Sequence, residues 1–411
     1  DVAKAIPQGR PQGQEALLQK AAEMLLAAEA PVILAGGGVG LSRTGEELTK
    51  LSQLLDAPIV SSIMGAASFS GDHPGFAGFI GSYGTELANS LVKSADVIFA
   101  VGTRFEEEET AIWQDGEVLA APPSKIIHLD IDPMVIGKNY PVEVGLVGEA
   151  AVTLARLLEI VEEAAGQGPI RGERLSALAR GRQEWMEKLK PDITSAKKPI
   201  NPRRVLQALK DRLPPEAIMT VDCSWSRVGL LQQLGQPGPD RCYIVGGVLP
   251  IGWAAAAALG VAQGRCPARV AAVVGDGGFL MSIQCLLTAA EYNLPITWLV
   301  INNGGYNALD VLQRVYFGGR SVGSCFRKED TGQDVSPDFA AIAAGFHLAG
   351  ERIEEPDQIE AAISRAFEIE GPCVLDFVCD PEESRLIRTA PVTWSYFWSG
   401  QRKKGVSDLV G

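Results

Sequence analysis

The stretch Val270-Ala271-Ala272-Val273-Val274-Gly275-Asp276-Gly277-Gly278-Phe279, followed later by Ile301-Asn302-Asn303-Gly304-Gly305-Tyr306, decides the fold of this 411-residue chain. The first stretch begins with an apolar run, and the second follows one. Each run is typical of a strand that is buried on both faces. Between them, Met281–Asn293 carries apolar side chains at helical spacing, and Pro295 ends that segment. Strand, helix and strand over about thirty residues form a βαβ unit, whose two strands are parallel.

Asp276 and Asn303 each follow one of these predicted strands, and they lie 27 residues apart. Open parallel sheets bind ligands at the carboxyl ends of their strands, so we expect both side chains at one edge of the sheet. The glycines at 277 and 278 allow backbone N–H groups to approach a phosphate closely. A carboxylate, an amide oxygen and a backbone carbonyl make an all-oxygen set, which suits Mg²⁺ that shares its shell with phosphates.

The motif GDGGF, followed by NN at this separation, resembles the diphosphate-binding motif of enzymes that use thiamine diphosphate (thiamine pyrophosphate, ThDP). A second segment, Gly246–Trp253, resembles the glycine-rich turn that places a bulky apolar residue under the bent cofactor in that family. The resemblance covers nearly the whole chain and points to the acetolactate synthase and benzoylformate decarboxylase branch. An ordinary turn rich in Gly and Asn is the alternative interpretation, and the second motif argues against it.

The resemblance implies a set of site residues. The implied Mg²⁺ ligands are Asp276, Asn303 and the backbone carbonyl of Gly305. The implied cofactor-binding residues are Ser224, Leu249, Ile251, Gly277, Gly278, Asn303, Gly305 and Tyr306. Ile251 would be the apolar wedge between the two cofactor rings, and the Leu249 carbonyl would orient the aminopyrimidine. For Ser224 a second interpretation is equally open, namely that it or Asp222 caps the next helix.

The activity implied by the resemblance is ThDP- and Mg²⁺-dependent cleavage or formation of a carbon–carbon bond. The substrate would be a 2-oxo acid, acted on by a decarboxylase or an acetolactate-synthase-like carboligase. A 2-hydroxyacyl-CoA lyase, with an acyl-CoA substrate, is the close alternative, because it uses the same cofactor step on a different bond. The segment 308–313 departs from the acetolactate synthase pattern. A non-catalytic binding or regulatory chain with the same fold is the alternative from another class.

Composition limits the remaining functional classes. The chain is 46% hydrophobic and 21% charged, which indicates a globular protein. Its net charge of −13 argues against a nucleic-acid partner, and no apolar run is long enough to span a membrane. Seven cysteines without a C-x-x-C motif indicate reduced thiols and a cytoplasmic location. The three histidines are scattered, which argues against zinc.

The alternation of predicted helices and strands indicates an α/β protein with two doubly wound parallel-sheet domains. We expect a central domain over residues 1–164, a connector over 165–200, the diphosphate- and Mg²⁺-binding domain over 201–390, and an aromatic tail over 391–411. Gly36-Gly37-Gly38 could cradle the phosphate of FAD or a nucleotide. The triplet lacks the full G-x-G-x-x-G spacing, so a tight structural turn is the better interpretation.

In the family that the chain resembles, a glutamate that activates the cofactor lies in an N-terminal pyrimidine-binding domain. The sequence begins as if at the exit from such a domain. We therefore expect that domain to come from a preceding segment or a separate chain, within a homo-oligomer (a dimer or a tetramer). Within this sequence, the acidic run Glu106–Glu109 is the first place to search for an activating acid, although such a run is usually a solvated loop.

Overall fold

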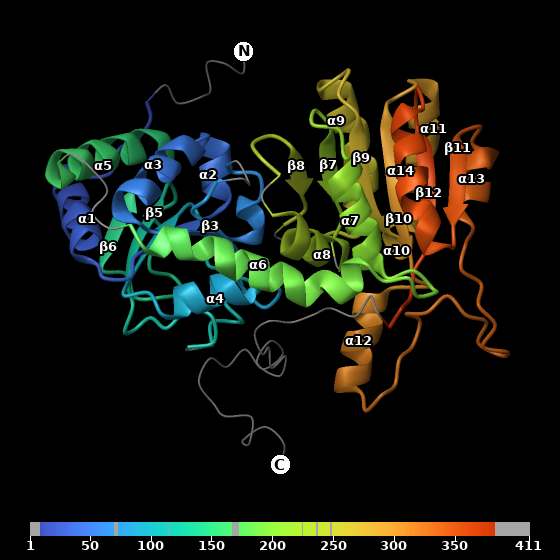
Figure 1. The fold of residues 1–411 in the computed structure, drawn as a ribbon, viewed down its shortest axis with the longest axis horizontal. Coiled ribbons are helices and arrows are strands. Elements are labelled where there is room, and N and C mark those ends of the chain that lie inside the picture. The colour runs from blue at the N-terminus through green and yellow to red at the C-terminus, as the bar shows by residue number, and fades with distance from the viewer. Residues whose placement is uncertain are drawn as a thin grey trace. The chain divides into compact units, whose positions relative to one another are not determined.

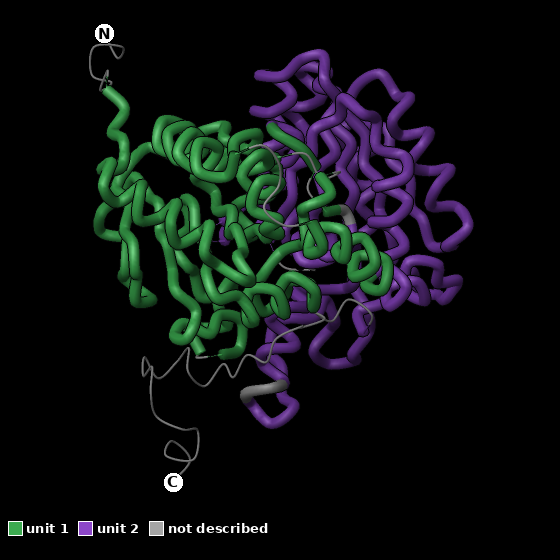
Figure 2. Tube along the Cα trace, turned by 60° about the vertical axis from the view of Figure 1, so that its left-hand side comes forward, with its two compact units in different colours: residues 1–185, 235–239, 388–411 green, residues 186–234, 240–387 purple. Residues whose placement is uncertain are grey.

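A computed structural model describes residues 9–69, 73–114, 116–166, 172–223, 225–235, 237–246 and 249–382. The chain forms two compact units, shown in green and purple in Figure 2. The first unit reaches Trp185 and includes residues 235–239, and the second contains residues 186–234 and 240–387. The boundary between them falls inside one long helix, α6 (Arg174–Ile193), which occupies much of the predicted connector. The predicted tail over 391–411 lies outside the described residues.

The first unit holds a six-stranded sheet in the order β3-β2-β1-β4-β5-β6, with every neighbouring pair parallel. Its strands are β1 (Val32–Ala35), β2 (Ile59–Ser61), β3 (Phe76–Phe79), β4 (Val97–Val101), β5 (Lys125–Asp130) and β6 (Val144–Val147). Its helices are α1 (Glu15–Ala27), α2 (Gly37–Ser42), α3 (Gly45–Leu55), α4 (Glu86–Lys93) and α5 (Ala150–Ala165) (Figure 1). This strand order is that of doubly wound nucleotide-binding sheets.

The second unit also holds six parallel strands, in the order β11-β12-β10-β9-β7-β8. Its strands are β7 (Ile218–Val221), β8 (Cys242–Ile244), β9 (Val270–Gly275), β10 (Ile296–Asn302), β11 (Ala349–Ile353) and β12 (Cys373–Val378). Its helices are α7 (Pro202–Arg212), α8 (Trp225–Leu234), α9 (Trp253–Gly264), α10 (Asp276–Ser282), α11 (Cys285–Glu291), α12 (Asn307–Tyr316), α13 (Phe339–Gly345) and α14 (Ile359–Glu368). The expectation of two doubly wound parallel sheets is confirmed.

The order of the second sheet reverses between β7 and β9, because β8 lies outside β7 while β10 lies on the far side of β9. Ligands of open α/β sheets bind at such a switch point, beyond the carboxyl ends of the strands. Asp222 follows β7 and Asp276 follows β9, so two acidic side chains stand at this point. The core beneath them is formed by alternate strand residues, such as Val270, Ala272 and Val274, packed on α9 and α11.

One predicted helix differs from the structure. The helix expected over Met281–Asn293 is instead a pair, α10 and α11, and α10 starts on Asp276 itself. Gly275 therefore ends β9, and the rest of the GDGG segment is helical rather than a loop before a helix. Further along the chain, α13 ends at Gly345 and Ala349 opens β11, an edge strand whose glycine and charged residues hide its strand character in the sequence.

Candidate functional site

The Asp276 carboxylate organises the loop that follows β10. It accepts hydrogen bonds from the backbone N–H groups of Gly277 at 2.7 Å, Gly304 at 2.7 Å and Gly305 at 2.9 Å. Its side chain is buried, and that burial raises the pKa of Asp276 to about 6, against the opposing effect of the backbone hydrogen bonds. The bonds to Gly304 and Gly305 therefore join the end of β9 to the end of β10 through a single acid.

Asn303 lies in the same loop, and its side-chain oxygen is buried. Among the residues that the structure describes, this Oδ1 atom has no hydrogen-bond partner. A buried polar atom without a partner is costly, and such atoms commonly mark a place for an ion or a ligand. A carboxylate and an unpaired amide oxygen on two adjoining strand ends are donors that fit Mg²⁺.

The two motif glycines lie against side chains that come from elsewhere in the sequence. A Cβ atom on Gly277 would stand 2.4 Å from Cε1 of Tyr306, and one on Gly278 would stand 2.3 Å from Oδ2 of Asp222. Gly305 has φ of +153°, and a Cβ there would lie 2.2 Å from the Ser324 carbonyl oxygen. Any larger residue at these three positions would displace a neighbour of the site.

Asp222 connects this motif with the turn that contains Leu249 and Ile251. Its carboxylate accepts hydrogen bonds from the N–H groups of Gly252 at 2.9 Å and Ala254 at 3.3 Å. It therefore caps α9, rather than the helix that follows it in sequence. Leu249 has φ of +53°, a left-handed conformation that non-glycine residues seldom adopt, and Ile251 is exposed at 36% of its surface.

The structure thus brings Asp276, Asn303, Gly305, Gly277 and Gly278 together, with Tyr306 packed on Gly277. The turn with Leu249 and Ile251 is tied to the same place by Asp222, for which the sequence suggested only a capping role. The only signal for Asp222 in the sequence was its place directly after a predicted strand. Ser224, the remaining predicted site residue, lies outside the described residues.

A cavity of about 170 Å³ borders the Asn303–Gly305 loop, and its lining includes Asp310, Arg314, Cys325 and Arg352. Pockets that enclose a drug-sized ligand usually measure about 300–1,000 Å³. This cavity is therefore too small to enclose a whole dinucleotide-sized or thiamine-sized cofactor.

In the first unit, the Gly36–Gly38 triplet makes a close crossing of two strand ends. A Cβ on Gly36 would stand 2.2 Å from the Gly102 carbonyl oxygen, and one on Gly38 would stand 2.7 Å from Gly102 Cα. The Gly36 N–H donates to Val101 and the Gly38 N–H donates to Gly102. Two of the three amides are thus engaged with backbone, which favours the structural turn over a phosphate cradle.

The interpretation of Glu106–Glu109 as a solvated loop is wrong for its last member. Glu109 is buried, and it accepts a hydrogen bond of 2.9 Å from the Thr103 hydroxyl. Burial raises the pKa of Glu109 to about 7, and the neighbouring charge of Glu106 adds to the effect of burial. The first unit therefore contains a buried carboxyl that is partly protonated near neutral pH.

Two family models match the chain. Residues 18–157 match the central domain of thiamine pyrophosphate enzymes, and residues 226–377 match their C-terminal thiamine pyrophosphate binding domain. The chain belongs to the thiamine pyrophosphate enzymes. The first match lies within the first unit, and the second includes β9 and β10, the strands that lead into Asp276 and Asn303.

Curated relatives of this thiamine pyrophosphate enzyme are acetolactate synthase large subunits. A probable one from Methanocaldococcus jannaschii is 31% identical over 386 residues, which is 90% of this chain and 61% of the relative. One from Corynebacterium glutamicum is 31% identical over 373 residues, 88% of this chain and 56% of the relative. One from Haemophilus influenzae is 28% identical over 372 residues, 90% of this chain and 62% of the relative. The chain thus spans about three fifths of the length of these relatives.

No helix among the described residues has the length and apolar character needed to cross a membrane. All seven cysteines are free thiols.

Proposed function

We propose that this thiamine pyrophosphate enzyme catalyses Mg²⁺-dependent carbon–carbon bond formation between 2-oxo acids, in the manner of an acetolactate synthase. The observation that carries the proposal is the pairing of the buried Asp276 carboxylate with the unpartnered Oδ1 of Asn303. The names of the curated relatives support the choice of a carboligase over the 2-hydroxyacyl-CoA lyase. The cytoplasmic location proposed for it rests on the free thiols alone.

Asp276, Asn303 and the carbonyl of Gly305 would hold the Mg²⁺ ion, which would in turn bind the cofactor diphosphate. Asp276 supplies the formal negative charge, and its three backbone hydrogen bonds fix the direction of its oxygens. The N–H of Gly278 lies in the first turn of α10, where N–H groups have no partner within the helix and can donate to a phosphate. The N–H groups of Gly277 and Tyr306 already donate to protein oxygens.

When bound, thiamine diphosphate supplies a carbanion that attacks a carbonyl and a ring that accepts the electrons freed when the carbon–carbon bond breaks. The chain's share is orientation and shape. Asp222 holds the turn at Gly252, and Ser282 donates a hydrogen bond of 2.9 Å to the Gly252 carbonyl. The exposed side chain of Ile251, next to this fixed glycine, is the apolar surface on which we expect the cofactor to bend.

The proposed activity would need a larger cofactor site than the cavity beside the Asn303–Gly305 loop provides. The cavity beside the proposed metal-binding loop is too small to enclose the cofactor. We propose that a pyrimidine-binding domain, from the same polypeptide or from a separate chain, completes the site within a homo-oligomer. This chain covers about three fifths of each relative, and the remaining two fifths are long enough to hold such a domain.

The test has two parts, binding and turnover. Calorimetry with thiamine diphosphate, in the presence and absence of Mg²⁺, should show metal-dependent binding to the parent and none to Asp276→Ala. Asp357→Ala, an equivalent change of an exposed aspartate in the same unit, is the matched control and should bind like the parent. Equal affinity for the parent and Asp276→Ala would contradict the metal assignment.

For turnover, carbon dioxide release and acetolactate formation from a panel of 2-oxo acids should be measured together. We expect neither from residues 1–411 alone, and both after a pyrimidine-binding domain is added. Release of carbon dioxide without a coupled product would indicate a decarboxylase instead of a carboligase. Robust turnover by the chain alone would show that the activating acid lies within it, with Glu109 as the first residue to replace.

A further inference from the structure

Asp376 is a carboxylate in the interior of the second sheet that the proposed chemistry does not use. It lies on β12, between β10 and β11, and none of its surface is exposed. Its Oδ2 accepts hydrogen bonds from Arg352 Nη1 at 2.6 Å and from the Phe339 N–H at 3.0 Å. Its Oδ1 accepts one from Asn302 Nδ2 at 2.9 Å.

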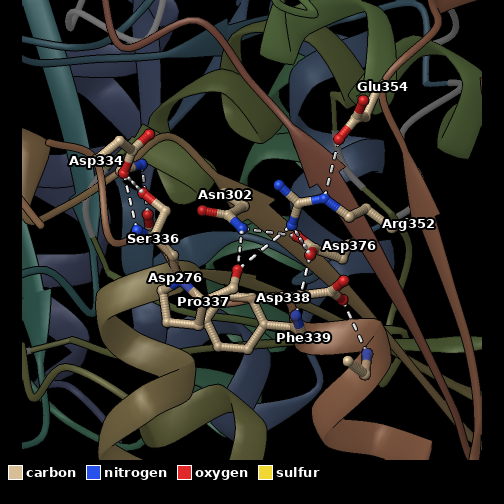
Figure 3. Close-up of polar contacts among 12 residues, drawn as sticks. Asp276, Asn302, Asp334, Ser336, Pro337, Asp338, Phe339, Arg352, Glu354 and Asp376 are labelled. Carbon is tan, nitrogen blue, oxygen red and sulfur yellow. Dashed lines mark hydrogen bonds and ion pairs between the residues drawn. The ribbon is translucent and has the colours of Figure 1, made fainter.

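These contacts form a chain across three neighbouring strands, as Figure 3 shows. Arg352 on β11 is paired in register with Asp376 on β12, and Asp376 is paired with Val300 on β10. The bond to Asn302 therefore runs diagonally toward the carboxyl end of β10. Asn302 Nδ2 also donates to the Pro337 carbonyl at 3.0 Å, so both amide protons of this side chain are engaged.

Asn302 is the last residue of β10, and the proposed Mg²⁺ ligand Asn303 follows it directly. Two groups thus restrain the start of this loop. On the β9 side, Asp276 accepts hydrogen bonds from the N–H groups of Gly304 and Gly305. On the β12 side, Asp376 fixes the Asn302 side chain, and the Cys379 N–H donates to the Asn302 carbonyl at 2.8 Å.

A buried charge at this position needs an explanation other than stability. Burying the Asp376 carboxylate costs about as much as its attraction to the partly buried Arg352 returns, so this pair is a poor source of net stability. Buried polar networks can instead fix one arrangement of the groups that they contact. Here the group whose arrangement is fixed adjoins the metal-binding loop.

We propose that Asp376 is a positioning residue, which holds Asn302 and thereby the Asn303–Gly305 loop in the conformation that receives Mg²⁺ and a diphosphate. The part of this inference that concerns metal rests on the proposed function. The part that concerns the loop does not, because it is argued only from hydrogen bonds between protein groups.

Two variants separate the positioning role from simple stability. Asp376→Asn keeps the size of the side chain but places amide protons against Asn302, Phe339 or Arg352. Asn302→Ala leaves the pair of Arg352 and Asp376 intact and removes only the link to the loop. Ile363→Ala, in the buried face of α14, is the control that destabilises the same unit and removes none of the hydrogen bonds of this network.

The first readout is amide hydrogen exchange of peptides that cover residues 303–307, in protein without ligands. We expect exchange in both variants to rise at least about tenfold above that in Ile363→Ala, the effect of losing a hydrogen bond to a charged group. The second readout is calorimetry with thiamine diphosphate and Mg²⁺, where a loss of affinity of the same size is expected. The control should bind like the parent.

Exchange at 303–307 that stays at the level of Ile363→Ala in both variants would overturn the positioning role. If Asp376→Asn does not fold, Asn302→Ala carries the test by itself. If the parent binds no thiamine diphosphate with Mg²⁺, the proposed function fails, while the exchange comparison still decides whether Asp376 holds the loop.

Discussion

Replacement of Glu109 by glutamine should stabilise the first unit at pH 8 by about 1–3 kcal/mol and leave its stability at pH 5 nearly unchanged. Glu109 is buried, and among the described residues it makes no ion pair. Burial raises the pKa of Glu109 from 4.5 to about 7. The folded protein therefore holds a proton on this carboxyl that the unfolded chain has already released.

The sign and size follow from this difference. Below pH 4.5 both states are protonated and the carboxyl has no effect on stability. Between pH 4.5 and about 7 the folded state binds more protons, so the free energy of unfolding falls as the pH rises. Above pH 7 the free energy of unfolding has fallen by its full amount, which is about 3 kcal/mol for this difference in pKa. Glutamine keeps an acceptor for the Thr103 hydroxyl, but its amide protons need partners, and this lowers the expected gain.

The assay is urea unfolding at several pH values from 5 to 8.5, with hydrogen exchange of β4 and β5 peptides reporting on the first unit. Glu107→Gln is the matched control, because Glu107 belongs to the same acidic run but is exposed. The free energy of unfolding of this control should equal that of the parent at every pH. A Glu109→Gln variant that is less stable than the parent at pH 8 would refute the reasoning, since it would mean that the fold stabilises a charged carboxylate at this position.

Three predictions concern the second unit. Because burial raises the pKa of Asp276 to about 6, protons compete with Mg²⁺ below that pH, and calorimetry should show affinity falling about tenfold per pH unit there; a flat profile from pH 5 to 7.5 would contradict Asp276 as a ligand. Gly277→Ala should abolish binding of thiamine diphosphate measured by calorimetry, because the new Cβ meets the Tyr306 ring at 2.4 Å; parent-like binding would mean that the ring moves without consequence. Ile251→Ala should lower the turnover of the completed enzyme more than it lowers the affinity for the cofactor, whereas Ile251→Leu should keep the volume and most of the activity. Equal turnover of the alanine variant and the parent would contradict the role of Ile251 as a wedge.

The sequence was sufficient for the parts of the second unit that depend on neighbours in the chain. A strand that ends in Gly275, an acid directly after it, and a second strand that ends at Asn302 are local patterns, and their spacing was enough to predict parallel strands with both polar groups at one edge. Strands such as β6, β8 and β11 carry no such local pattern, because partial exposure gives them a mixed composition.

The supports of the site could not be predicted, because their partners lie far away in the sequence. Asp222 meets Gly252 across 30 residues, and Asp376 meets Asn302 across 74. Nothing in the local pattern states which of many backbone N–H groups an acid will find. Asp376 did carry one signal, a charged residue inside the apolar run of β12, where a side chain without a partner would be expensive.

The motif glycines show why a correct motif can have an incomplete explanation. The sequence suggests that glycine at 277 and 278 lets backbone N–H groups approach a phosphate. In the structure, the Cβ positions of Gly277 and Gly278 are already taken by Tyr306 and Asp222. Glycine is therefore required there before any ligand arrives, since these contacts bring the loop after β10 and the end of β7 against α10. A loss of cofactor binding in a glycine variant consequently reports on the assembly of the site as much as on a phosphate contact, and only a variant that spares these neighbours can separate the two.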